Sequence, residues 1–219
     1  MPDPSDVLTY QGGWTDTASG RVLISLPESE PDPQWPLLLF LHGAGERGED
    51  LELAATHGPL KERRAGRDLP FVIAVPQVPE GERWTVGRVA AALDAVLEDP
   101  RIDPDRVTIT GLSMGGFGTW EAIERMPERF AAAVPICGGG NPLGLAAARD
   151  VPVWTFHGAQ DDVVPLAATM WMVESLRDVG GDVRLTVYPD ANHDSWTETY
   201  ANSEVYEWLL SHRLSDRAQ

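Results

Sequence analysis

The stretch VTITGLSMGGFGTW, residues 107–120, joins an alternating apolar run to four glycines that surround a single serine, Ser113. Alternation is typical of a β-strand, and we expect a helix to begin just after the serine. A sharp turn between a strand and a helix strains its central residue, so the positions two residues before and after it favour glycine. Gly111 and Gly115 occupy those positions. The G-x-S-x-G pattern therefore predicts a nucleophile elbow at the carboxyl edge of a sheet, with an ordinary polar turn as the alternative.

A nucleophilic serine needs a base, because its hydroxyl is a weak nucleophile until its proton is removed. Three histidines follow Ser113 in the chain. His157 ends an apolar run and His212 lies in the last turn of a helical segment, whereas His193 lies in the loop YPDANHDSW, residues 188–196. This loop separates the last predicted strand from the last predicted helix, again at the carboxyl edge of the sheet. His193 is therefore the candidate base.

An acid that orients the histidine is expected after the preceding strand, since the chain order in such sites is Ser, Asp or Glu, His. The loop HGAQDDVVP, residues 157–165, supplies Asp161 and Asp162 at that place. One of the two is expected to be only a turn residue or a helix cap. The residues by themselves leave open which one orients the histidine.

The segment LFLHGAGERG, residues 39–48, follows an early buried strand and is a candidate for an oxyanion hole. A tetrahedral intermediate needs one N–H donor from the residue after the nucleophile and one from such a loop. Met114 would supply the first and Ala44 the second. Trp84 and Trp196 lie in loops near these elements, and we expect them to line the substrate pocket, with half-buried packing as the alternative.

The rest of the chain alternates between strand and helix patterns, which predicts an α/β domain with a mostly parallel, doubly wound sheet. The chain of 219 residues is expected to form a single domain, 1–219, with its core at about residues 20–211. Residues 46–68 are expected to hold a short helix and a loop. The predicted strands are 21–26, 35–43, 71–77, 106–110, 131–136, 151–158 and 182–189, and the predicted helices are 86–99, 119–126, 166–180 and 203–212.

The composition excludes several classes of partner. The formal net charge of −17 would repel phosphate backbones and anionic lipids, so we expect no nucleic acid or membrane partner. The expected partner is a small-molecule ester, and the expected state is a monomer or small homo-oligomer. The N-terminus resembles no signal peptide and no apolar run approaches the length of a membrane span, which favours a cytoplasmic protein. Cys137 is the only cysteine and is expected to be a buried spectator, so no structural zinc site is predicted.

With these residues located, the chain resembles the α/β-hydrolases. Within that superfamily it is similar to the phospholipase/carboxylesterase and dienelactone-hydrolase-like serine esterases, which are related to the catalytic domains of prolyl oligopeptidases. The resemblance covers about residues 20–211 and rests on LHGAGERG, TGLSMGGFGTW, PICGGG, FHGAQDDVVP and NHDSW, in this order and spacing. In the H-G-x-x-D-x-x-V-P pattern of that family the acid is the fifth residue. The resemblance therefore implies that Asp161, and not its neighbour Asp162, is the acid.

The function that the resemblance implies is hydrolysis of a small carboxylic ester by Ser113, His193 and Asp161, with no cofactor and no metal ion. Dienelactone hydrolases proper carry cysteine at the elbow, so the serine of this chain argues against diene-lactone chemistry. The segment 120–151 is too short for a large lid domain, which favours short-chain or compact aromatic acyl groups. The alternatives are an acyl-thioesterase, a small peptidase-like hydrolase and a non-catalytic ligand-binding member of the fold.

Overall fold

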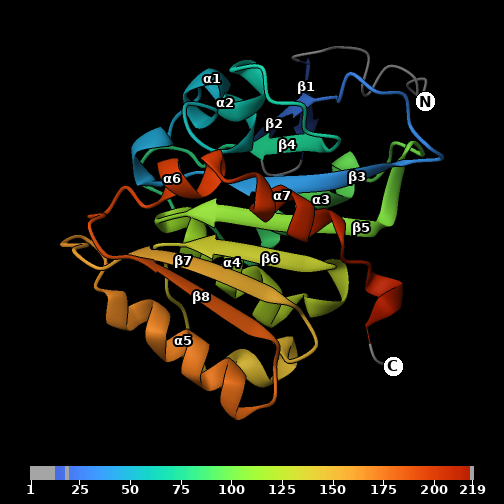
Figure 1. Cartoon of the computed structure of the whole chain (residues 1–219). Coiled ribbons are helices and arrows are strands. Elements are labelled where there is room, and N and C mark those ends of the chain that lie inside the picture. Colours follow the sequence, from blue (N-terminus) through green and yellow to red (C-terminus); the bar gives the residue numbers. More distant parts are fainter. Residues whose placement is uncertain (1–12, 18–19, 218–219) are drawn as a thin grey trace.

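Strand β3 (Trp35–Leu41) lies in the middle of the sheet, and all seven of its residues are buried. The computed structural model describes residues 13–17 and 20–217. Eight strands form one sheet, and helices cover both of its faces (Figure 1). The other strands are β1 (Gly13–Thr17), β2 (Gly20–Ser25), β4 (Val72–Pro76), β5 (Ile102–Leu112), β6 (Ala132–Ile136), β7 (Val153–Gly158) and β8 (Val183–Tyr188). The helices are η2 (Ala44–Glu46), α1 (Leu51–Ala54), α2 (Pro59–Arg64), α3 (Val86–Val96), α4 (Met114–Arg125), η3 (Pro127–Arg129), η4 (Pro142–Ala148), α5 (Leu166–Asp178), α6 (Trp196–Ala201), α7 (Ser203–Leu210) and η5 (Leu214–Asp216).

The strand order is β1-β2-β4-β3-β5-β6-β7-β8. Pairing is parallel from β4 to β8 and antiparallel where β2 joins β1 and β4, so the prediction of a mostly parallel sheet is confirmed. Parallel strands end at the same edge, which brings the loops after β3, β5, β7 and β8 together. These four loops carry the candidates Ala44, Ser113, Asp161 and His193, while Trp84 lies in the segment that follows β4.

The sheet separates two apolar cores because successive side chains of a strand point to opposite faces. Leu37 and Leu39 of β3 pack with residues of α3, α4 and α5. Leu38 and Phe40 pack on the other face with residues of α1, α2, α6 and α7. The unbroken apolar sequence of β3 is thus explained by burial on both faces, and the prediction of helices on both faces is confirmed.

The structure corrects the sequence prediction at three places. The sheet begins with β1 (Gly13–Thr17), before the predicted start of the core at residue 20. This short edge strand has no apolar alternation in its sequence, which is common for edges. Residues 46–68 contain two short helices, α1 and α2, where one was expected. The terminal helix is preceded by α6, and Asn202 separates the two helices by accepting a hydrogen bond from Glu204 N–H at the start of α7.

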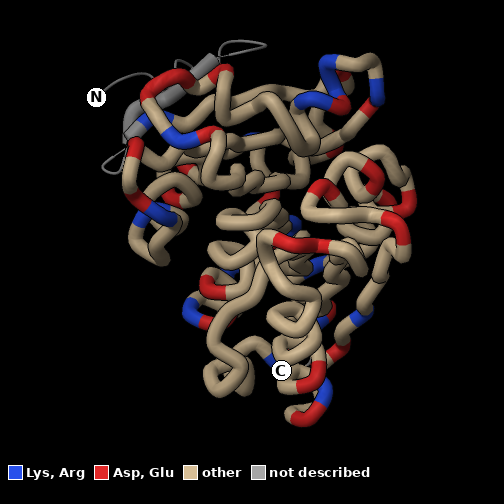
Figure 2. The backbone as a smooth tube through the Cα atoms, turned by 90° about the vertical axis from the view of Figure 1, so that its left-hand side faces the viewer, with Lys and Arg blue, Asp and Glu red and all other residues tan. Residues whose placement is uncertain are grey.

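Figure 2 shows acidic residues on many outer segments of the described backbone, with basic residues among them. The acidic excess is therefore spread over the molecule, as the net charge of −17 suggests. Among the helices of the described ranges, none has both the length and the apolar character that a bilayer crossing requires.

Candidate active site

Ser113 lies between the last residue of β5 and the first residue of α4, at φ 51° and ψ −116°. A positive φ is rare for a residue with a side chain and indicates a strained turn that its surroundings hold in place. The backbone N–H of Ser113 donates to Ile136 O of β6 at 2.9 Å. A Cβ atom on Gly111 would overlap the carbonyl of Gly115, and one on Gly115 would overlap the carbonyl of Leu41. These close approaches explain why glycine stands two residues before and two residues after the serine.

The structure brings Ser113, His193 and Asp161 into one hydrogen-bonded chain. The Nε2 atom of His193 lies 2.9 Å from Ser113 Oγ, and its Nδ1 atom lies 2.8 Å from Asp161 Oδ2. The carboxylate of Asp161 can only accept, so Nδ1–H donates to it and Nε2 is left to accept from the serine hydroxyl. This is the tautomer that a general base requires. The neighbouring carboxylate, Asp162, is exposed to solvent.

Asp161 is held by donors on both of its oxygens. Its Oδ1 accepts from the N–H groups of Val163 and Val164 at 2.9 and 2.8 Å, while Oδ2 faces His193. Burial acts to raise the pKa of Asp161, but the hydrogen bonds from His193 and the two backbone N–H groups outweigh it, and the pKa lies below its usual value. The carboxylate is therefore ionised at neutral pH although its side chain has no exposed surface.

A second histidine, His157, supports the same loop. Its Nε2 lies 3.2 Å from Asp161 Oδ2 and 2.9 Å from Val164 O, and its Nδ1 lies 2.8 Å from Thr169 Oγ1. Burial lowers the pKa of His157. His157 was not the histidine that the sequence favoured as the base, and in the structure it lies against Asp161. Its position at the start of the loop HGAQDDVVP, which also contains Asp161, is the feature of the sequence that could have indicated this contact.

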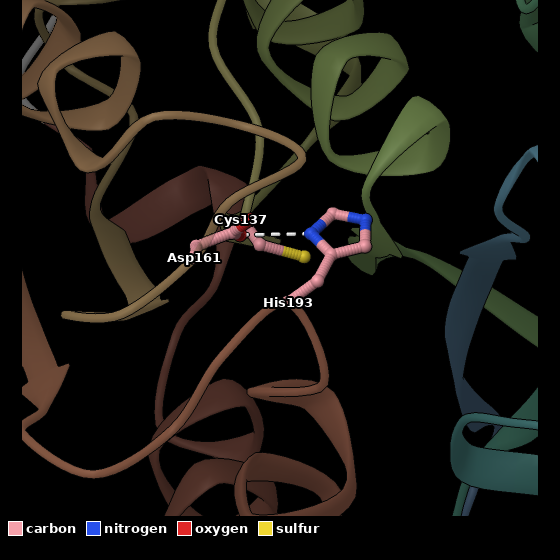
Figure 3. A group of neighbouring side chains, drawn as sticks. All are labelled: Cys137, Asp161 and His193. Atoms are coloured by element: carbon pink, nitrogen blue, oxygen red, sulfur yellow. Dashed lines mark hydrogen bonds and ion pairs between the residues drawn. The ribbon is translucent and has the colours of Figure 1, made fainter.

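Cys137 lies beside the acid and the histidine (Figure 3). Its sulfur, a carboxylate oxygen of Asp161 and a ring nitrogen of His193 all lie within 4.8 Å of one another. Burial is the main cause that raises the pKa of the Cys137 thiol to about 12. The thiol is therefore protonated at neutral pH and packs as a small apolar group, as expected for a buried spectator.

The two residues predicted to form an oxyanion hole both begin a helix. Ala44 is the first residue of η2 and Met114 is the first residue of α4. Backbone N–H groups in the first turn of a helix have no acceptor within the helix, so both groups can donate to a ligand. The sequence did not identify what fixes this loop. His42 Nδ1 donates to Gly43 O at 2.6 Å and its Nε2 accepts from Val78 N–H at 3.0 Å.

His42 makes a pH-dependent contribution to stability. Burial is the main cause that lowers its pKa from 6.5 to about 4. Between these values the unfolded chain binds a proton at His42 and the folded protein does not, so stability falls as the pH drops from 6.5 to 4. The full difference corresponds to about 3 kcal/mol. His42→Gln replaces the ring that makes the hydrogen bonds with Gly43 O and Val78 N–H, so we expect a lower free energy of unfolding than in the wild type at pH 7. This difference in free energy of unfolding should narrow towards pH 4, because only the wild type loses the stability linked to His42.

Urea unfolding of both proteins at several pH values measures this gap. His212→Gln is the matched control, because that ring lies near the C-terminal end of α7, outside the loop. A gap between wild type and His42→Gln that stays constant from pH 7 to pH 4 would contradict the assignment.

A cavity of about 510 Å³ opens beside Ser113. Its lining includes Trp84, whose indole N–H also donates to His42 O at 2.9 Å and so ties the cavity wall to the loop with Ala44. Trp196 is not part of the lining of this cavity. It begins α6, which packs on the opposite face of the sheet from α4, and its indole lies edge-on to His193 with ring centres 5.2 Å apart. The full lining is Arg47, Arg83, Trp84, Ser113, Met114, Phe117, Gly118, Glu121, Glu124, Arg125, Gly140 and Asn141.

Comparison with known proteins agrees with this architecture. The chain is 29% identical over 171 residues to the bifunctional acetylxylan esterase/xylanase XynS20E of Neocallimastix patriciarum, an alignment covering 74% of this chain and 25% of that protein. A crystal structure of a thermostable esterase is 33% identical with a TM-score of 0.81, covering 93% of this chain and 63% of the other. A putative dienelactone hydrolase from Klebsiella pneumoniae subsp. pneumoniae MGH 78578 is 20% identical with a TM-score of 0.66, covering 91% and 95%, and supports the fold alone.

The chain thus spans a quarter of the acetylxylan esterase/xylanase and under two thirds of the thermostable esterase. Residues 76–207 match the model of the dienelactone hydrolase family. This match covers more than half of the chain and includes Ser113, Asp161 and His193. The protein belongs to the dienelactone hydrolase family and has the α/β-hydrolase fold.

Proposed function

We propose that the protein is a serine hydrolase that cleaves carboxylic esters of short-chain or compact aromatic acids. The observation that carries the proposal is the hydrogen-bonded chain from Ser113 Oγ through His193 to Asp161, with distances of 2.9 and 2.8 Å. The names of two relatives, an acetylxylan esterase and a thermostable esterase, favour an ester over other acyl compounds. The proposed reaction uses no cofactor and no metal ion.

In the proposed mechanism Ser113 Oγ attacks the ester carbonyl carbon while His193 Nε2 takes the hydroxyl proton. Asp161 keeps Nδ1–H in place and stabilises the imidazolium that forms. The N–H groups of Ala44 and Met114 stabilise the oxyanion of the tetrahedral intermediate. His193 then gives the proton to the leaving alcohol, which leaves an acyl group on Ser113. A water molecule, deprotonated by the same histidine, hydrolyses the acyl-enzyme and restores the serine.

Covalent labelling tests this proposal directly. A fluorophosphonate should add one phosphonyl group to the protein and stop hydrolysis of 4-nitrophenyl acetate, because the attacking oxygen is then blocked. Intact mass gives the stoichiometry, and peptide mapping gives the position, which should be Ser113. Modification at another residue, or hydrolysis that continues after complete labelling, would contradict the mechanism.

The proposed preference for small acids follows from the walls of the cavity. Five of its twelve lining residues are charged, so a long alkyl chain would displace water from charged groups. Each methylene that stays in water forgoes about 0.8 kcal/mol of transfer free energy. Residues 46–68 do not provide a long apolar cover, since Leu51, Ala54 and Leu60 pack against the sheet.

We therefore expect kcat/KM for 4-nitrophenyl esters to be highest for short acyl chains. Esters from acetate to palmitate form the test series, measured at concentrations below and above their solubility limits. A maximum at twelve carbons or more, or a sharp rise in rate at the solubility limit, would show that a lid-like cover exists.

A further inference from the structure

His157 is a buried polar residue to which the proposed mechanism gives no task. It lies in β7, whose six residues are all buried, and its side chain has no exposed surface. Burial of a polar group is destabilising unless the group is hydrogen-bonded, so packing alone would favour an apolar residue at this position. The contacts of the ring therefore have to explain why a histidine stands here.

These contacts determine where one proton of the ring lies. Nε2 of His157 lies 2.9 Å from Val164 O and 3.2 Å from Asp161 Oδ2. A carbonyl oxygen and an ionised carboxylate can only accept, so Nε2 carries a hydrogen and donates. Its N–H faces both oxygens, with the shorter distance to Val164 O. The carboxylate of Asp161 therefore faces an N–H group of His157 in addition to Nδ1–H of His193.

Val164 connects His157 to the other oxygen of the same carboxylate. The backbone N–H of Val164 donates to Asp161 Oδ1 at 2.8 Å, while its C=O accepts from Nε2–H of His157. The ring thus acts on Oδ2 directly and on Oδ1 through the backbone of Val164. A change that removes Nε2–H removes both constraints on the carboxylate at once.

The opposite side of the ring is held by α5. Nδ1 of His157 lies 2.8 Å from Oγ1 of Thr169, a fully buried residue of that helix. The same hydroxyl donates to Gly138 O, in the segment after β6, at 2.5 Å. The imidazole is therefore fixed between α5 and the turn 161–164. A side chain whose orientation is fixed by packed, hydrogen-bonded neighbours can hold a reacting group precisely.

We propose that His157 is a positioning residue for Asp161: its Nε2–H, directly and through Val164, keeps the carboxylate aligned with Nδ1–H of His193. This inference rests on the proposed ester hydrolysis, in which Asp161 orients the histidine. His157 is not part of the lining of the cavity beside Ser113, so its loss should change the reaction step and leave substrate binding as it is. The expected result is a lower kcat at an unchanged KM.

Two amide variants separate the Nε2–H group from the packing of the ring. The amide nitrogen of glutamine is three bonds from Cβ, as Nε2 of histidine is, whereas that of asparagine is two bonds away, as Nδ1 is. His157→Gln therefore keeps a donor for Val164 O and Asp161 Oδ2, and His157→Asn loses it. With 4-nitrophenyl acetate, we expect kcat to stay within about threefold of the wild type in His157→Gln and to fall by about tenfold to a hundredfold in His157→Asn, because a small displacement of a reacting group is costly.

The rates are compared at equal fractions of folded protein, which urea unfolding measures for each variant. His212→Asn is the matched control, since it makes the same substitution near the C-terminal end of α7. It should keep the wild-type kcat.

Nuclear magnetic resonance gives two signals that packing alone would not change. In isotope-labelled wild type, the ring nitrogens of His157 are identified by their absence from the spectrum of His157→Gln, and Nε2 should carry a hydrogen. This signal tests the proposal even where His157→Asn does not fold. Nδ1–H of His193, which lies 2.8 Å from Asp161 Oδ2, should give a resonance far downfield. That resonance should remain in His157→Gln and be broadened or lost in His157→Asn.

Failure of this inference is distinguishable from failure of the proposed function. An Nε2 of His157 without a hydrogen, or equal losses of kcat in the two amide variants, would overturn the positioning role and leave ester hydrolysis standing. A wild-type kcat in His157→Asn, with an unchanged downfield resonance, would overturn it as well. Absence of hydrolysis by the wild type, together with no fluorophosphonate labelling, would overturn the proposed function itself.

Discussion

Ser113→Ala is expected to lower kcat for 4-nitrophenyl acetate by about a thousandfold or more, because only oxyanion and binding contributions to the rate would remain. The fold should be unaffected. Ser113 Oγ makes its hydrogen bond to His193, whereas the turn is held by the backbone bond from Ser113 N–H to Ile136 O, which alanine keeps. Alanine and serine also meet a similar backbone strain at φ 51°.

Steady-state kinetics and thermal unfolding of the same preparations measure the two parts of this prediction. Ser203→Ala is the matched control, since Ser203 is an exposed serine at the start of α7. It should keep the wild-type rate. Hydrolysis near the wild-type rate by Ser113→Ala, in a preparation free of other esterases, would contradict the role of Ser113.

The order of strands and helices was predictable because the faces that each element buries determine the spacing of its apolar residues. In β3 every side chain is buried, and the sequence WPLLLFL accordingly shows no alternation. The strained turn was predictable as well, since steric exclusion at Gly111 and Gly115 leaves glycine as the residue that fits without displacing backbone. Such constraints act on residues close together in the chain, so the sequence alone reveals them.

Contacts between distant segments were harder to predict. His42 fixes the loop that carries Ala44 through its hydrogen bond with Val78, and the indole N–H of Trp84 donates to His42 O, but no spacing rule connects these positions. Trp196 was expected to line the substrate pocket. Its ring lies against those of His193 and His57, outside the lining of the cavity beside Ser113. Proximity in sequence to a functional residue does not fix the side to which a side chain points.

The choice between neighbouring carboxylates illustrates the same limit. Asp161 and Asp162 are chemically identical, and the residues alone left the acid open until a family resemblance favoured Asp161. The structure separates them by environment. Asp161 has a fully buried side chain and faces His193, while Asp162 is exposed. This difference in environment leads to a sharp expectation for their two amide variants.

Asp161→Asn should lower kcat by about a thousandfold to ten-thousandfold, and Asp162→Asn should change it by less than about threefold. An asparagine at 161 can still accept from Val163 and Val164 through its amide oxygen, as Oδ1 does now. Its NH₂ group would then replace Oδ2 and face His193 Nδ1. Two donors cannot face each other, so the imidazole proton moves to Nε2 and the ring donates to Ser113 instead of accepting from it. The base is lost although the geometry is kept.

Steady-state kinetics at pH 7 and circular dichroism test this pair of variants. Asp162→Asn is the matched control, because it removes one negative charge at the adjacent position. The pKa of Asp161 lies below its usual value, so this carboxylate stabilises the folded state above the pKa of the unfolded chain, and that contribution is lost as the pH falls through the folded pKa. Asp161→Asn removes this stabilising contribution at neutral pH too, so the rates of the variant and the wild type must be compared at equal fractions of folded protein. Equal losses in the two variants would mean that both carboxylates orient His193, and a larger loss in Asp162→Asn would transfer the role to Asp162.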